Sequence, residues 1–412
     1  TEFIGTHFLL NVLLTAACSL ASSAAAWLLL SLFPDDFSLT SALVVWVFSG
    51  LNLIRNLTLT SEALLRMEFE FGRLSLFHGL GTVLALVSTL MAAKAGWQAS
   101  SLILGGWSTI SVLSVVYVLF FSTATLLTRP LRPRQLRFDL TWARRLLSYG
   151  VWIWIGWVLQ TFIVWYDRLV IWLLIGKIEM ALYNHAMWLV QIPTAVISHM
   201  IFSYTNALYS RYKDDSDRLG ALFGRMLRIV VRISSPLALI FVLNAHELMT
   251  LMPKWSHAAP IVIWLAIFAF ARPLLDEGYG LLWAVGATRM SAAIVGIQAT
   301  LALVMLPLVA KTFGVPGIAY GMGVVITVGL IGLFVVLRRF LTIDLKRVLA
   351  VPVLGLGLAA LCTTVVSHFI SGPPLLDFAI KTCSIAVVYL VVRWAFEHRY
   401  MTAAYLQLRL IL

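Results

Sequence analysis

Residues 316–337 read PGIAYGMGVVITVGLIGLFVVL, a run without a charged side chain that ends directly before Arg338 and Arg339. The hydrocarbon core of a bilayer is about 30 Å thick, and roughly 20 apolar residues cross it as a helix. Inside hydrocarbon, the backbone amides and carbonyls of a single span must bond within the segment, and a helix achieves this. The run therefore predicts a transmembrane helix.

The rest of the chain repeats this pattern. The 412 residues contain twelve mainly apolar runs, near 8–32, 40–61, 74–93, 101–126, 147–174, 183–207, 226–245, 258–285, 290–310, 316–337, 349–370 and 374–395. The connections are short and carry proline, glycine or charge, as in Gly314-Val315-Pro316-Gly317. We therefore expect an all-α polytopic membrane protein with about twelve visible spans.

The composition excludes a soluble enzyme. Hydrophobic residues make up 61% and charged residues 12% of the chain, and the mean hydropathy is +0.94, whereas a soluble domain is nearer half apolar and a quarter charged. The sequence has no nucleophile elbow and no phosphate-cradling glycine loop. Its three cysteines and eight histidines show no metal-binding spacing. We therefore expect neither catalysis nor a metal or organic cofactor.

The positive charge of the chain is distributed unevenly between alternate loops. Thirty Lys and Arg against 18 Asp and Glu give a net charge of +12. Of the 30 basic residues, 22 fall on one side of the predicted membrane, 5 on the other and 3 inside spans. The positive-inside rule makes the basic side cytoplasmic and places the C-terminus there. The charge thus indicates orientation and gives no reason to expect nucleic-acid binding.

Eight short motifs carry a resemblance to a known family. They are ALLRMEFEF (63–71), LSYG (147–150), WYDRLVI (165–171), LIG (174–176), ALYNHA (181–186), QIP (191–193), YSR (209–211) and GVPGIA (314–319). In this order and spacing they resemble the polysaccharide transporter family. These are Wzx-type flippases of lipid-linked oligosaccharides, including O-antigen precursors, within the MOP superfamily that also holds the MATE exporters.

The resemblance implies fourteen helices, in two lobes of six plus a final pair. Matching the inner loops places the first visible span at the family's third helix, so the family's first two helices would be absent. It implies an N-lobe remainder at 1–126 (family helices 3–6) and a basic cytoplasmic linker at 127–146. A C-lobe at 147–338 (helices 7–12) and a C-terminal helix pair with a cytoplasmic tail at 339–412 (helices 13–14) would follow. In that case the sequence is either part of a longer chain or that of a family member that no longer transports.

A polar face marks the second visible span. Ser49, Asn52, Arg55, Asn56 and Thr60 recur at three- and four-residue spacing and so share one side of a helix. As a cavity wall, this face would use Arg55 to attract a pyrophosphate or an acidic sugar, because guanidinium binds phosphate oxygens bidentately. Alternatively, the face is a hydrogen-bonded seam between helices in which Arg55 reaches a carboxylate.

The eighth visible span carries the ionisable residues Arg272, Asp276 and Glu277. Such groups are costly at mid-bilayer and normally face the bundle interior. We expect either a gate or a coupling site that exchanges H+ or Na+, or a static Arg272–Asp276 pair one helical turn apart. Counted from the midpoint of each predicted span, Arg55 and Asp276 lie at similar depths in the bilayer. We therefore expect Arg55 to face Asp276 or Glu277 across the cavity.

The fifth and sixth visible spans supply the remaining candidates. Asp167 matches the aspartate of the family motif and, beside Arg168, is interpreted either as a gate residue or as part of an interhelix salt bridge. Neutral groups that suit sugar hydroxyls, with one indole as a stacking surface, accompany them: Gln160, Asn184, Trp188 and Gln191. The last three are spaced by four and three residues and so share one side of a helix.

Three functions are consistent with these features. The leading hypothesis is a bacterial inner-membrane flippase that moves a polyprenyl-diphosphate-linked oligosaccharide outward by alternating access, with membrane lipids and polysaccharide assembly proteins as partners. The second is a non-transporting, flippase-like structural subunit of a larger membrane complex, motivated by the two missing helices. The third is a MATE-like cation antiporter, which Arg55 and Arg272 disfavour because they repel cations.

Overall fold

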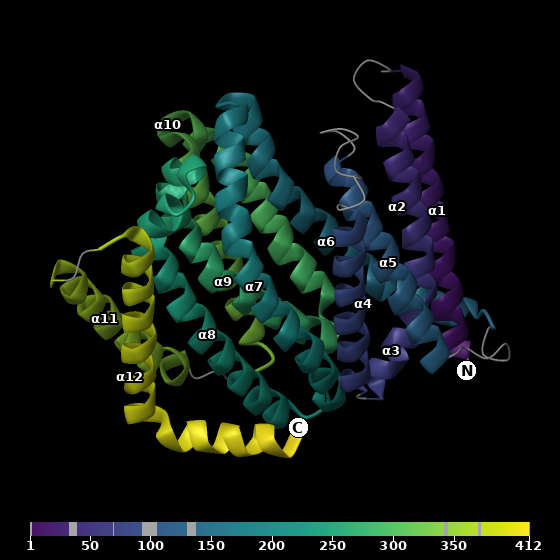
Figure 1. Cartoon of the computed structure of the whole chain (residues 1–412). Coiled ribbons are helices and arrows are strands. Elements are labelled where there is room, and N and C mark those ends of the chain that lie inside the picture. The colour runs from purple at the N-terminus through teal and green to yellow at the C-terminus, as the bar shows by residue number, and fades with distance from the viewer. Residues whose placement is uncertain are drawn as a thin grey trace. The chain divides into compact units, whose positions relative to one another are not determined.

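The computed structural model describes residues 2–32, 39–68, 70–92, 105–129, 137–341, 345–369 and 372–411. Within these ranges the ordered elements are helices and no strand occurs. The chain divides into two compact units, residues 1–148 and 149–412. The structure confirms the predicted all-α, multi-span fold class (Figure 1).

The N-terminal unit is built from helix pairs. α1 (Glu2–Leu32) packs against α2 (Leu39–Leu57), and α4 (Phe71–Ala92) packs against α5 (Gly105–Thr128). α2 also contacts α5, and the short α3 (Leu59–Met67) contacts all four of these helices. A small core of Leu65, Leu74 and Phe121 joins α3, α4 and α5.

The apolar run predicted as one span at 40–61 forms two helices. α2 ends at Leu57 and α3 begins at Leu59. The Thr58 hydroxyl donates a hydrogen bond of 2.7 Å to the carbonyl oxygen of Arg55. Threonine side chains that bond nearby backbone groups compete in this way with regular helix bonding. The predicted C-terminal boundary of this span is therefore wrong.

The C-terminal unit surrounds one central helix. Its elements are most of α6 (Leu140–Leu174), α7 (Lys177–Tyr212), α8 (Ser216–Thr250), the 3-10 helix η3 (Pro253–Ala258), α9 (Ala259–Ala284), α10 (Thr288–Leu337), α11 (Leu345–Phe369) and α12 (Pro374–Ile411). α9 packs against α7, α8 and α10, and most of its residues are buried. An apolar composition on all sides is common to membrane spans, so it is the burial of α9 between its neighbours that makes it the interior helix of the unit.

Two antiparallel spans make up α10. The helix is 50 residues long, which at 1.5 Å per residue would span about 75 Å. It breaks at Gly314, whose φ of 63° lies in the left-handed region that glycine adopts without strain. Beyond the break the chain packs back on itself, since the Gln298 amide donates to the Val325 carbonyl oxygen at 3.2 Å.

Eight helices of the described residues are long and apolar enough to cross a membrane, and α10 counts as one of them although it holds two predicted spans. Two shorter apolar helices cover 72–88 and 115–128. Length and composition therefore support a multi-pass membrane protein.

Ion pairs join α12 to α8 near both ends of the α12 span. Lys381 bonds Glu247 at one end. At the other end, Arg232 Nε donates to Glu397 Oε2 at 2.6 Å, and Arg393 lies 3.5 Å from the same carboxylate. Glu397 also has non-helical backbone angles (φ −130°, ψ 15°), and α12 turns there (Figure 1). The turn in the helix therefore coincides with its buried charge contacts.

The contact between α9 and α10 predicts a sensitive glycine. A Cβ atom at Gly278 would lie 2.2 Å from Cδ2 of the fully buried Leu333. We expect Gly278→Ala to lower the free energy of unfolding by about 1–3 kcal/mol, as overpacking does, measured by thermal unfolding in detergent.

Gly224→Ala on α8 is the matched control. No atom lies within 4 Å of the Cβ position at Gly224. A helical alanine there should leave stability unchanged or raise it by up to about 1 kcal/mol. Equal unfolding temperatures for both variants would contradict the tight contact.

Candidate functional site

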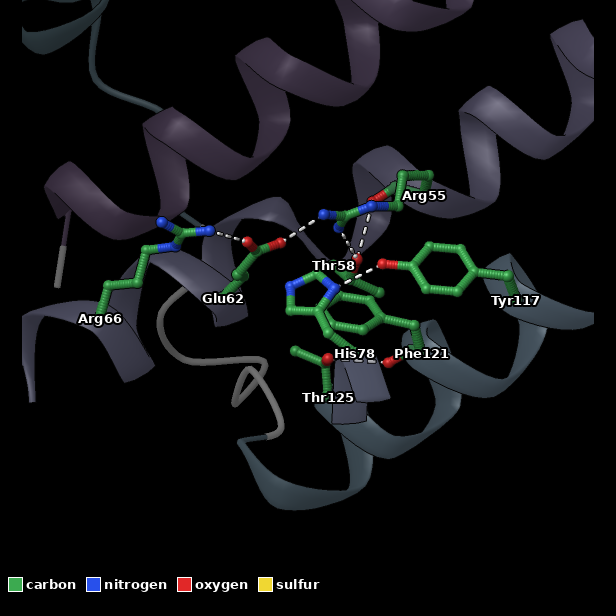
Figure 2. Close-up of polar contacts among 8 residues, drawn as sticks. All are labelled: Arg55, Thr58, Glu62, Arg66, His78, Tyr117, Phe121 and Thr125. Carbon is green, nitrogen blue, oxygen red and sulfur yellow. Dashed lines mark hydrogen bonds and ion pairs between the residues drawn. The ribbon is translucent and has the colours of Figure 1, made fainter. Parts of the chain in front are cut away.

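One end of the N-terminal unit gathers polar side chains from α2, α3, α4 and α5 (Figure 2). Arg55 lies in the last turn of α2, where the partial negative charge of the helix end favours a cation. Its Nη1 donates to the Thr58 hydroxyl at 3.0 Å. Because α2 ends at Leu57, Arg55 lies closer to the end of its helix than the predicted span implied.

Glu62 on α3 is shared between two arginines. Its Oε2 accepts a hydrogen bond from Arg55 and its Oε1 accepts one from Arg66, each at 2.6 Å. The Glu62 side chain is 7% exposed, whereas those of Arg55 and Arg66 are 25% and 40% exposed. Burial alone would raise the pKa of Glu62, but the two guanidinium groups outweigh it and hold the pKa below its ordinary value of 4.5. Glu62 is therefore ionised at neutral pH.

Aromatic and hydroxyl groups complete this arrangement. The His78 ring bonds the Tyr117 hydroxyl at 2.5 Å, and the Arg55 guanidinium carbon lies 4.6 Å from the centroid of the buried Phe121 ring. A cation over an aromatic face is stabilised by the ring's negative charge density. We refer to this set as the Arg55 cluster, namely Arg55, Thr58, Glu62, Arg66, His78, Tyr117 and Phe121.

The other predicted residues of α2 lie outside the cluster. Asn56 donates its side-chain amide to the carbonyl oxygen and to Oδ1 of Asn52, at 2.8 and 3.0 Å. These two asparagines therefore bond each other along α2, while Arg55 bonds Thr58 and Glu62. Within the predicted polar face, the two asparagines thus form a local pair that is separate from the charged site.

Asp167 on α6 is fully buried and bonded to a neighbouring helix. Its Oδ2 accepts a hydrogen bond of 2.7 Å from the Tyr183 hydroxyl on α7, and its Oδ1 lies 3.2 Å from Arg168 Nη1. Arg168 Nε also donates to Asn184 Oδ1 at 2.8 Å. The structure therefore brings Asp167 and Asn184 together through Arg168.

Arg168 and Asn184 line a groove of about 590 Å³ in the C-terminal unit. Aromatic side chains form much of its wall, namely Phe162, Trp165, Tyr166 and Trp172. The guanidinium carbon of Arg168 lies 5.5 Å from the Trp165 ring centroid. Such a surface suits an apolar chain or the face of a sugar ring.

Three other predicted residues are absent from the lining of this groove. Gln160 and Gln191 are half-buried, and Trp188 is 59% exposed. Asn184 was expected to share a sugar-binding face with Trp188 and Gln191. Of these three residues, only Asn184 lines the groove.

The acidic groups of α9 have different surroundings. Asp276 Oδ1 lies 3.0 Å from Arg272 Nε, one helical turn away. Glu277 is 2% exposed and accepts hydrogen bonds from the hydroxyls of Tyr209 and Thr205 on α7, the latter at 3.1 Å. Asp276 is thus compensated by a cation, whereas the bonds described for Glu277 come from neutral groups.

The expected contact between Arg55 and Asp276 or Glu277 differs from the bonds that these groups make. Arg55 binds Glu62 inside the N-terminal unit. Asp276 and Glu277 bind groups inside the C-terminal unit. Each therefore has a partner within its own unit.

Sequence reasoning named Arg272 as a partner of Asp276, but it missed the groups that bond Arg55, Asp167 and Glu277. Glu62 was detectable, because it lies seven residues after Arg55 and four before Arg66, spacings that return to one side of a helix. Tyr183 and Tyr209 gave no such signal, since they reach Asp167 and Glu277 from another helix. Among the described residues, no group of three or more His, Cys, Asp or Glu could hold a metal ion.

The low pKa of Glu62 predicts an acid-sensitive contact. Its ion pairs stabilise the fold fully above its unfolded pKa, near 4.5, and this stabilisation is lost as the pH falls through the lower folded value. We expect Glu62→Gln to lose this part of the acid dependence, measured as the unfolding temperature between pH 6 and pH 3 in detergent. Parallel curves for wild type and variant would contradict the assignment.

Solved structures with the same fold are known. The chain is similar to the lipid II flippase MurJ in an inward closed conformation, with a TM-score of 0.67 and 13% identity over 97% of this chain and 84% of that one. It is similar to an outward-facing multidrug resistance MATE transporter of the MOP superfamily (TM-score 0.65, 16% identity, 82% of this chain and 78% of that one). It is also similar to the Vibrio cholerae MATE transporter VcmN in the bent form (TM-score 0.63, 13% identity, 82% and 78%).

Among curated proteins, none matches this chain. A family described as "Polysaccharide biosynthesis protein" matches residues 1–260. The matched range includes seven of the eight motifs, all except GVPGIA at 314–319. The chain therefore belongs to this polysaccharide biosynthesis protein family and has the fold of the MOP-superfamily transporters.

Proposed function

We propose that this protein is a flippase that moves a polyprenyl-diphosphate-linked oligosaccharide across the bacterial inner membrane by alternating access. The Arg55 cluster carries the proposal. It holds two partly exposed guanidinium groups but a single carboxylate, Glu62. Guanidinium groups bind phosphate oxygens with two parallel hydrogen bonds, which makes them suited to a diphosphate.

The position of the cluster fits an entry site. It lies at the end of α2 and the start of α3, next to the loop with Arg66 and Arg73, which the charge pattern of the sequence assigns to the basic side. The positive-inside rule makes this side, together with the C-terminus, cytoplasmic. Polyprenyl-diphosphate-linked sugars would be attracted there by the basic loops, and salt would weaken that attraction.

Glu277 is the best candidate for coupling to an ion. Its surroundings in α7 and α9 supply hydroxyl oxygens, whereas Asp276 has Arg272 as a counter-charge. A buried carboxylate without a cation is stable when it takes up a proton or binds a small cation. Exchange of H+ or Na+ at Glu277 would bias one transport state against the other.

Replacing Arg55 tests the diphosphate role. We expect Arg55→Ala to reduce translocation of a labelled lipid-linked oligosaccharide in proteoliposomes by roughly tenfold or more, because a charge-assisted contact is lost. The control is Arg129→Ala, since Arg129 pairs with the exposed Glu68. Unchanged transport by Arg55→Ala would favour a purely structural seam.

Replacing Glu277 tests the coupling role. We expect Glu277→Gln to make the transport rate independent of an imposed proton or sodium gradient, because the side chain can no longer change its charge. Glu247→Gln, at a carboxylate paired with Lys381, should keep the dependence. A Glu277→Gln variant that still responds to both gradients would rule out Glu277 as the coupling group.

A further inference from the structure

The Glu62 carboxylate occupies the position that an anionic ligand of Arg55 and Arg66 would take. Figure 2 shows it between the two guanidinium groups, with one oxygen directed at each. A diphosphate likewise offers oxygens to two guanidinium groups at once. Ligand and carboxylate would therefore compete for the same donors.

The Arg55 cluster carries more positive than negative charge and so could bind a second anion. Arg55 and Arg66 carry two positive charges, and Glu62 compensates one of them. The neighbouring arginines differ, since Arg129 pairs with Glu68 and Arg73 with Glu70, one carboxylate each. The Arg55 cluster thus combines an unbalanced positive charge with partial exposure.

Arg55 has contacts that do not depend on Glu62. The Phe121 ring lies against its guanidinium group, and the Thr58 hydroxyl accepts a bond from its Nη1. These contacts would hold the guanidinium group in place if the carboxylate moved away. A preorganised donor binds an incoming anion with a smaller entropic cost.

We propose that Glu62 is a carboxylate latch, which occupies Arg55 and Arg66 in the unloaded protein and is displaced when a diphosphate group binds. The inference rests on the proposed function and adds a competitor to its anion site. Displacement breaks the two hydrogen bonds that Glu62 accepts from Arg55 and Arg66, and the incoming anion would replace them. The latch would keep the two arginines paired in the absence of substrate and lower the affinity for small anions.

The test measures binding of inorganic pyrophosphate to the purified chain in lipid nanodiscs by calorimetry. We expect Glu62→Gln to bind pyrophosphate roughly tenfold more tightly than wild type or better, because the ionic competitor is removed. Glu68→Gln is the matched control, which removes a nearby carboxylate that contacts Arg129. It should change the affinity by less than about threefold, as expected of a screened surface charge.

The Glu62→Asp variant distinguishes competition by the carboxylate for the two arginines from the effect of its negative charge alone. It keeps the negative charge but shortens the side chain, so that one carboxylate no longer reaches both arginines at bonding distance. The latch predicts a higher pyrophosphate affinity for this variant as well, and it serves if Glu62→Gln does not fold. Wild-type affinity in Glu62→Asp, or in a folded Glu62→Gln, would overturn the latch.

Different experimental results would contradict the latch and the proposed function. If Arg55→Ala abolishes pyrophosphate binding while both Glu62 variants bind like wild type, the anion site stands and the latch is wrong. If wild type and both folded Glu62 variants show no pyrophosphate binding, the latch is also wrong. The transport assay on Arg55→Ala then decides the proposed function by itself.

Discussion

A charged side chain inside a bilayer requires a partner within the protein, because hydrocarbon offers neither counter-charge nor hydrogen bonds. Asp167 meets this requirement through Tyr183 and Arg168, and Asp276 meets it through Arg272. Both solutions use charge against charge. Glu277 differs, because the bonds described for it come from two hydroxyls.

Close packing between helices shapes the interior of the C-terminal unit. α9 is enclosed by α7, α8 and α10, and its buried face is continuous rather than a single stripe. Two membrane-spanning halves of α10 approach one another closely enough for Gln298 to bond the Val325 backbone. Small residues permit such approaches, and packing between helices replaces the hydrophobic driving force that is missing in lipid.

The sequence predicts helices well here because length and hydropathy suffice to define a span. It fails where a local bond overrides hydropathy, as at Thr58, which separates α2 from α3 within one apolar run. The site residues likewise include some that the sequence reveals and some that only a specific contact reveals. Arg55 and Glu277 are conspicuous as charges in apolar surroundings, whereas Tyr183 and Tyr209 become meaningful only once α7 is placed beside α6 and α9.

The ion pairs that join α12 to α8 have a mechanical consequence. Lys381 and Glu397 lie near opposite ends of the α12 span, and each is held by a charge on α8. Sliding α12 along α8 by one helical turn, about 5.4 Å, would separate both pairs at once. The two pairs therefore favour a single register between the helices, in which α12 and α8 move together.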